Sequence, residues 1–209
     1  MKNLVVLSKL LATHCLNKMR DRNASSRCFR EELTKLSYFL AYECAEELET
    51  ETRSVKTPME TLANASFIKS SIVLGSIMRA GNGMLDPFLQ IFPEAGVAHV
   101  GIFRNENHQP VEYYWRAPNN LNNKTVLLLD PMLATGGSAT KAIEVFKEKG
   151  AGKIVFVSII AAPEGVAKVH EKFPEIKIFT ASLDRELNSK AYIVPGLGDA
   201  GDRIYGTEH

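Results

Sequence analysis

The 209-residue sequence lacks several features that would assign it to a functional class at once. Its charge is balanced, with 25 lysines and arginines against 24 aspartates and glutamates, so no basic excess indicates a nucleic-acid partner. No apolar run reaches the roughly 18 residues that span a bilayer, and the short apolar segment near the N-terminus does not fit a signal peptide. These absences favour a cytoplasmic protein without a nucleic-acid or membrane partner.

Residues that hold metals or act as nucleophiles are also sparse. The three cysteines, Cys15, Cys28 and Cys44, have no C-x-x-C spacing, so free thiols in a reducing compartment are expected. The five histidines are scattered without metal-ligand spacing. A Walker motif and a G-x-S-x-G motif are both missing from the sequence, which argues against a P-loop nucleotide-binding protein and a serine hydrolase.

The sequence does contain a clear alternation of apolar patterns. Residues 4–19 and 23–48 carry amphipathic helical spacing, with Asn23 or Ser25 as the N-cap of the second segment. After Thr57-Pro58, strand and helix patterns alternate, with strands at 72–77, 97–103, 126–129, 154–160 and 176–180 and helices at 84–92, 137–149 and 163–173. This order predicts an α/β fold whose mostly parallel sheet is covered by helices on both faces.

The most informative segment follows the most apolar strand pattern. It runs as D-P-M-L-A-T-G-G-S from Asp130 to Ser138 and leads directly into a helical pattern. Glycines at a helix N-terminus let backbone N–H groups approach an anion, and the helix adds partial positive charge. The upstream carboxylate suits the hydroxyls of a sugar phosphate. A plain strand-to-helix turn is the alternative interpretation, and Asp130 with its aliphatic strand weighs against it.

This segment resembles the phosphoribosyl-diphosphate (PRPP) motif of phosphoribosyltransferases, in the form found in uracil phosphoribosyltransferases. Further segments resemble the same family: M-R-A-G-N-G-M at 78–84, G-I-F-R at 101–104 with P-V-E-Y-Y at 110–114, and Y-I-V-P-G-L-G-D-A-G-D-R at 192–203. The resemblance covers nearly the whole chain and is most specific in the last segment. It implies one phosphoribosyltransferase domain over 1–209, with a helical front (1–56), a core (57–180) and a base-binding tail (181–209) that forms a small hood.

The resemblance implies that the chain transfers the phosphoribosyl group from PRPP to uracil, giving UMP and diphosphate. Asp130 would hold the ribose hydroxyls, residues 134–138 the 5′-phosphate, and Arg79 and Arg104 the diphosphate, which suits permanently charged guanidiniums. Asp199 would meet PRPP through Mg²⁺ and its waters. Ile193 and residues 198–200 would offer backbone groups to the uracil edge, beside Tyr192.

The predicted site therefore comprises three overlapping sets. The catalytic set is Arg79, Arg104, Asp130 and Asp199. The PRPP-binding set is Arg79, Arg104, Asp130, Pro131, Met132, Leu133, Ala134, Thr135, Gly136, Gly137, Ser138 and Asp199. The uracil-binding set is Tyr192, Ile193, Gly198, Asp199 and Ala200, and the one metal residue is Asp199, through water.

Some features of the sequence leave alternatives open. Asn82, Asn105 and the Trp115-Arg116-Ala117 run depart from the family pattern near the expected diphosphate site and the hairpin expected to cover it. Family members are homodimers or higher homo-oligomers and some respond to GTP, so both properties are expectations. One rival is a regulatory protein of this fold that senses UMP or PRPP and binds RNA. The other is a phosphoribosyltransferase for a different base.

Overall fold

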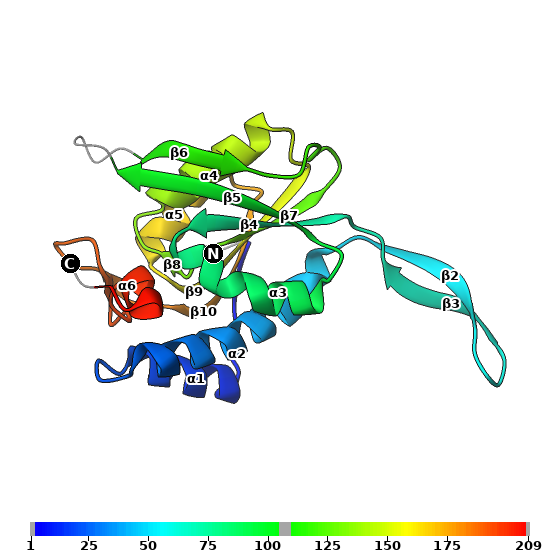
Figure 1. The fold of residues 1–209 in the computed structure, drawn as a ribbon, viewed down its shortest axis with the longest axis horizontal. Helices are drawn as coiled ribbons and strands as arrows, with labels where there is room; N and C mark the ends of the chain where they lie inside the picture. The colour runs from blue at the N-terminus through cyan, green and yellow to red at the C-terminus, as the bar shows by residue number, and fades with distance from the viewer. Residues whose placement is uncertain (1–2, 105–109, 208–209) are drawn as a thin grey trace.

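A central sheet of parallel strands organises the protein (Figure 1). The structure, a computed structural model, describes residues 3–104 and 110–207. Only the β5–β6 pair is antiparallel among the described strands of this sheet, and the short β8 (Met132–Leu133) adds to β9. The strand order is β1 (Leu4–Val6), β10 (Lys177–Leu183), β9 (Lys153–Ala161), β7 (Thr125–Leu129), β4 (Ile72–Met78), β5 (Gly96–Arg104) and β6 (Pro110–Arg116).

Helices cover both faces of this sheet, as the sequence pattern predicts. One face carries α1 (Leu10–Arg20), α2 (Ser26–Cys44) and α3 (Leu85–Ile91), with the 3-10 turns η1 (Ala45–Glu47) and η2 (Ala80–Met84). The other face carries α4 (Gly137–Glu148) and α5 (Pro163–Lys172). The tail contains β11 (Glu186–Leu187), β12 (Ile193–Val194) and α6 (Ala200–Tyr205). The predicted α/β fold class is confirmed.

Strand β7 shows why the sequence pattern was informative. All five of its residues are buried. Leu127 and Leu129 pack into the core beneath α2, whereas Val126 and Leu128 pack into the core beneath α4. A strand buried on both faces is a nearly continuous apolar run, which in β7 only the first residue, Thr125, interrupts. The carboxyl end of β7 is consequently anchored from both sides, directly before Asp130.

Two elements differ from the sequence-based expectation of an all-helical front. Residues 4–6 form the edge strand β1 rather than the start of a helix, and they pair in parallel with β10. Residues after η1 form a hairpin of β2 (Thr50–Lys56) and β3 (Thr61–Ile68), which projects away from the sheet in Figure 1. Of the two predicted N-caps, Ser25 caps α2, because its hydroxyl oxygen accepts the Cys28 N–H at 3.2 Å.

The structure also shows the state of the cysteines and the character of the helices. Cys15, Cys28 and Cys44 are free thiols, as predicted. Over residues 3–104 and 110–207, every helix is too short or too polar to span a membrane.

Candidate active site

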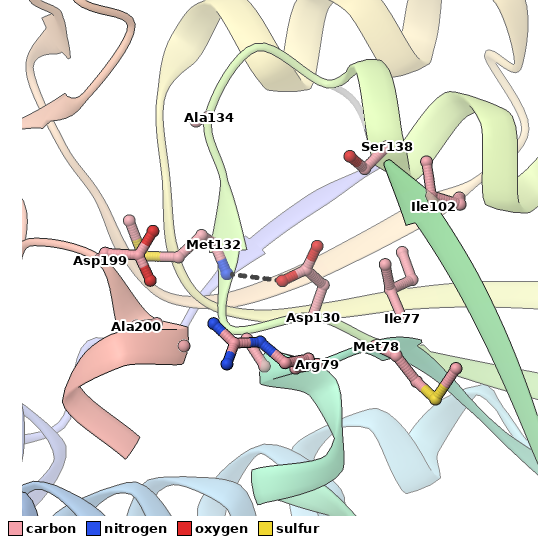
Figure 2. Close-up of a pocket in the computed structure, with 12 residues that line it drawn as sticks. Ile77, Met78, Arg79, Ile102, Asp130, Met132, Ala134, Ser138, Asp199 and Ala200 are labelled. Carbon is pink, nitrogen blue, oxygen red and sulfur yellow. Dashed lines mark hydrogen bonds between the residues drawn. The ribbon is translucent and has the colours of Figure 1, made fainter. Parts of the chain in front are cut away.

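A cavity of about 330 Å³ lies at the carboxyl edge of the sheet (Figure 2). Four polar residues of the predicted PRPP set line this cavity, and each comes from a different part of the chain. Arg79 follows β4, Asp130 follows β7, Ser138 lies in the first turn of α4, and Asp199 caps α6. Parallel strands end at one edge, which brings these distant residues together.

The loop between β8 and α4 has the geometry of an anion cradle. Gly136 has a φ of 77°, and a methyl group there would lie 2.8 Å from the Gly165 carbonyl oxygen and 2.9 Å from Lys168 Cβ. Gly137 is different, because a methyl group would only reach Thr135 Oγ1 at 3.6 Å and Pro110 Cγ at 3.9 Å. Gly136 is thus required by the fold, whereas Gly137 keeps the space at the start of α4 open.

Asp130 is the most perturbed acid of the site. Its Oδ1 accepts the Met132 N–H at 3.2 Å. Burial, reinforced by the neighbouring Asp199 carboxylate, raises the pKa of Asp130 from 3.8 to about 7 despite that hydrogen bond. The carboxyl group therefore changes charge near neutral pH. Hydroxyl donors or a cation beside it would favour the ionised form.

Arg79 is held by the C-terminal helix. Its Nη2 lies 3.3 Å from Asp202 Oδ1, and its guanidinium lies 5.8 Å from the ring centroid of Tyr205. The Tyr205 hydroxyl donates to the Arg79 carbonyl oxygen at 3.0 Å, and burial raises the pKa of that hydroxyl, which keeps it protonated. The Met78–Arg79 peptide bond is cis. The sequence analysis gave Asp202 and Tyr205 no role, although Asp202 belongs to the family-like tail.

A second cavity of about 350 Å³ adjoins the first. It is lined by all five residues of the predicted uracil set, from Tyr192 to Ala200, together with the unpredicted Lys190 and Ala191. The two cavities share Met132, Ala134, Asp199 and Ala200. Lys190 and Ala191 directly precede Tyr192, and this position in the sequence was the only indication that they belong to the site. The apolar residues Ile77, Met78 and Ile102 of the first cavity were also missed, although they lie near the carboxyl ends of β4 and β5.

Apart from Arg104, the remaining residues of the predicted PRPP set lie outside these two cavities. A smaller hollow of about 50 Å³ is lined by residues 130 and 132–139, so Leu133, Thr135, Gly136 and Gly137 face it. Pro131 lines none of these three cavities, and its carbonyl oxygen accepts the N–H groups of Ile159 and Ile160. Arg104 is the last residue of β5. Its side chain, Asn105 and the hairpin tip expected to cover the diphosphate fall outside the described residues.

The described residues place few metal ligands together. They contain no group of three or more His, Cys, Asp or Glu side chains that could hold a metal. Asp130 and Asp199 nevertheless line one cavity, and the charge of Asp199 helps raise the pKa of Asp130. Two facing carboxylates fit a cation that keeps most of its coordination for water and substrate oxygens, as Mg²⁺ does.

The parallel sheet, the cradle after β7 and the paired cavities define a phosphoribosyltransferase-type domain. A solved hypoxanthine-guanine phosphoribosyltransferase from Bacillus anthracis shares this fold, with a TM-score of 0.54 at 10% identity over 76% of this chain and 80% of that one. Residues 6–207 match the family model described as uracil phosphoribosyltransferase. The chain belongs to the uracil phosphoribosyltransferase family.

Individual relatives match over the full length of the chain. A protein named uracil phosphoribosyltransferase from Sinorhizobium fredii is 45% identical over 209 residues, covering 100% of both chains. The solved structure of the AQ2163 protein from Aquifex aeolicus is 39% identical, covers 98% of this chain and 99% of its own, and superposes with a TM-score of 0.88. The resemblance inferred from the motifs is thereby confirmed.

Proposed function

We propose that this protein transfers the phosphoribosyl group of PRPP to uracil, forming UMP and diphosphate. One observation carries the proposal: the cavity lined by Asp130 and by the ends of the glycine-rich loop, Ala134 and Ser138, adjoins a second cavity lined by tail residues, and Asp199 lines both cavities. A donor sugar and an acceptor base bound side by side require this arrangement. Membership of the family supports the same reaction.

The PRPP half of the site is assigned to the edge of the sheet. Asp130 accepts hydrogen bonds from the ribose hydroxyls, and residues 134–138 surround the 5′-phosphate at the N-terminus of α4. Arg79 directly follows β4 and Arg104 ends the neighbouring strand β5, which pairs with β4 in parallel, and the two arginines bind the diphosphate. Arg79 already has an acidic partner in Asp202, so the diphosphate would compete with that carboxylate.

The uracil half is assigned to the tail. Uracil presents an N3–H donor between two carbonyl acceptors, and the main chain of Ile193 and residues 198–200 provides complementary groups. Tyr192, an exposed residue, forms a wall of the pocket. Backbone groups cannot exchange donor for acceptor, so this arrangement selects uracil over cytosine.

A magnesium ion fits the acidic side of the site. Asp199 would hold it through water, facing Asp130 across the cavity. When bound, the ion neutralises charge on the diphosphate and so makes it a better leaving group.

Substitution at the ribose C1 needs alignment more than it needs a protein nucleophile. The transition state has oxocarbenium character, as at other glycosidic centres. The cradle and Asp130 fix the ribose, while the tail holds the base against C1. Arg79 and Arg104 stabilise the negative charge that grows on the departing diphosphate.

We also propose a homo-oligomer, supported by the β2–β3 hairpin. None of its strand residues is buried, and only Val55, Ala65 and Phe67 are half-buried. A two-stranded hairpin without a core is marginally stable alone, so a second copy would supply the missing contacts. Apolar side chains on the arm (Met59, Leu62, Ile68) and around a groove on α1 and α2 (Leu10, Leu11, Tyr42) are exposed and available for such contacts.

The remaining parts of the proposal follow the family and the composition. We treat residues 1–209 as one catalytic domain with residues 181–209 as its base-binding tail. The free cysteines support an enzyme of the reducing cytoplasm. GTP is proposed as an effector on the family resemblance alone.

Diphosphate release tests the reaction directly. Purified protein is incubated with PRPP, Mg²⁺ and one of several free bases, including uracil, cytosine and hypoxanthine. Release only with uracil is expected. Release with a purine instead would reassign the base pocket, and no release with any base would contradict the enzymatic function.

A further inference from the structure

The tail segment that precedes the proposed uracil-reading residues is anchored to the end of α1. We propose that Arg20 and Asp184 are positioning residues for uracil, because their ion pair fixes the backbone that leads into residues 198–200. This inference rests on the proposed function. It assigns part of the base selectivity to two side chains that line neither cavity.

The ion pair is buried and bidentate. Arg20 Nη1 lies 2.7 Å from Asp184 Oδ2, and Arg20 Nη2 lies 2.5 Å from Asp184 Oδ1. The Arg20 side chain is 19% exposed and that of Asp184 only 2%. Burial alone would raise the pKa of Asp184, but hydrogen bonds from Arg20 and Ser182 outweigh it and hold that pKa below its ordinary value. Such a pair gives a fixed direction to every further hydrogen bond it makes.

Both hydrogen bonds that the two side chains make with the main chain go to the same residue, Gly196. Arg20 Nη1 donates to the Gly196 carbonyl oxygen at 2.7 Å, and Asp184 Oδ2 accepts the Gly196 N–H at 2.9 Å. Gly196 has a φ of 64°, and a methyl group there would lie 2.0 Å from the Ile193 carbonyl oxygen. The pair therefore recognises the N–H and the C=O of a tight turn located two residues before Gly198.

A third side chain supports this clamp from the other direction. Arg203, on α6, donates from Nη1 to the Leu197 carbonyl oxygen at 2.9 Å, and its Nη2 lies 2.6 Å from the Asp21 carbonyl oxygen. The same Nη1 also donates to the carbonyl oxygen of Met19. The carbonyl oxygens of Gly196 and Leu197 thus each accept a hydrogen bond from an arginine. One of these arginines, Arg20, is the last residue of α1, and the other, Arg203, donates to main-chain carbonyls at the end of α1.

This arrangement separates base binding from PRPP binding. The cradle is carried by β7, β8 and α4, none of which contributes to the Arg20–Asp184 contacts. A backbone that reads donors and acceptors must be fixed before the ligand arrives, because any ordering on binding weakens affinity. Loosening Gly196 should therefore weaken uracil binding and base selectivity while PRPP binding is preserved.

The test compares three variants of graded severity with one control. Arg20→Lys keeps the charge but not the bidentate geometry, and Asp184→Asn keeps the shape but not the charge. Ser182→Ala leaves the ion pair intact and removes a hydroxyl that donates to Asp184 at 2.7 Å and accepts from Arg20 at 3.3 Å. The control is Lys147→Ala, which removes a different ion pair, that between Lys147 and Glu175. Lys147 lies in the last turn of α4, at the opposite end of that helix from the cradle. Unfolding curves establish that each protein is folded at the assay temperature.

We expect Arg20→Lys and Asp184→Asn to raise the uracil KM about 10-fold or more, with kcat and the PRPP Kd changed less than about 3-fold. The ratio of kcat/KM for uracil over cytosine should fall in the same variants. Ser182→Ala should show a smaller shift in the same direction, and it keeps the test valid if a charge variant does not fold. Lys147→Ala should match the wild type.

Two results would overturn the inference. One is an unchanged uracil KM and base ratio in folded variants. The other is a parallel loss of PRPP affinity, which would indicate general structural damage. A wild-type protein that releases no diphosphate with uracil would instead refute the proposed function, so the two failures are distinguishable.

Discussion

Replacing Asp130 by asparagine should stabilise the ligand-free protein at high pH while abolishing PRPP binding. The pKa of Asp130 rises from 3.8 to about 7 on folding. Between these values the folded state binds more protons than the unfolded state, so the free energy of unfolding falls as pH rises. Asparagine has a similar shape and can still accept the Met132 N–H, but it carries no charge to bury.

The magnitude follows from the two pKa values. The raised pKa of Asp130 lowers the free energy of unfolding by about 1.7 kcal/mol at about pH 5 and by about 4 kcal/mol at about pH 8, relative to a carboxyl group with an unshifted pKa. The difference in unfolding free energy between Asp130→Asn and the wild type should therefore grow by about 2.5 kcal/mol over that interval, in favour of the variant.

Chemical unfolding at several pH values, without ligand, measures this difference. Asp199→Asn provides a matched control, because the amide still caps α6 but removes a charge that raises the pKa of Asp130. In this variant the titration of Asp130 should move to lower pH. In parallel, calorimetry with PRPP and Mg²⁺ should show binding to the wild type and none to Asp130→Asn. An Asp130→Asn stability difference that is the same at low and high pH would refute the reasoning.

Four further predictions concern the cradle, the diphosphate, the base and the arm. Gly137→Val should remain folded, because that position is open, but lose PRPP binding by calorimetry; wild-type affinity would remove the cradle from the proposal. Arg79→Ala should lower kcat roughly 30- to 150-fold, the value of a charge-assisted contact of about 2–3 kcal/mol, in steady-state assays; a change in the uracil KM alone would place Arg79 in the base pocket. Cytosine should be used at least about 30-fold less efficiently than uracil, because buried polar pairs are left unmatched, whereas 5-fluorouracil should be accepted; equal use of cytosine in competition assays would contradict backbone reading. Replacing residues 50–68 by a short glycine linker should reduce the mass measured by light scattering, and an unchanged mass would show that the arm is not an interface.

The predictable part of the fold is the part with strong local patterns. The strands at 126–129 and 154–160 are buried on both faces, so their apolar runs indicate their place in the sheet directly. Strand β1 has three residues and exists through pairing with β10, which lies more than 170 positions later in the chain, as Leu4 opposite Ile178 shows. The β2–β3 hairpin buries no side chain, so it leaves no hydrophobic periodicity to detect.

The site divides in the same way. Asp130 and its glycine-rich loop form one continuous motif whose chemistry can be argued from the sequence. Asp202 and Tyr205 acquire a role only when α6 folds against the residue after β4. Arg20 and Asp184 are separated by 164 positions, and an ion pair at that distance has no local signature. Residues that support others were thus the ones that only the structure located.

The proposed reading of uracil by the main chain of residues 193 and 198–200 also has a consequence for selection with toxic base analogues. Main-chain groups are the same whatever side chains they carry, so a point mutation cannot simply exchange one donor for an acceptor at that edge. Few mutations can therefore prevent the binding of an analogue that has the same hydrogen-bonding edge as uracil without also preventing the binding of uracil. Cells selected for resistance to such an analogue should therefore carry inactivating mutations in this protein, spread over its core and its cradle, rather than a few substitutions that sharpen its choice of base.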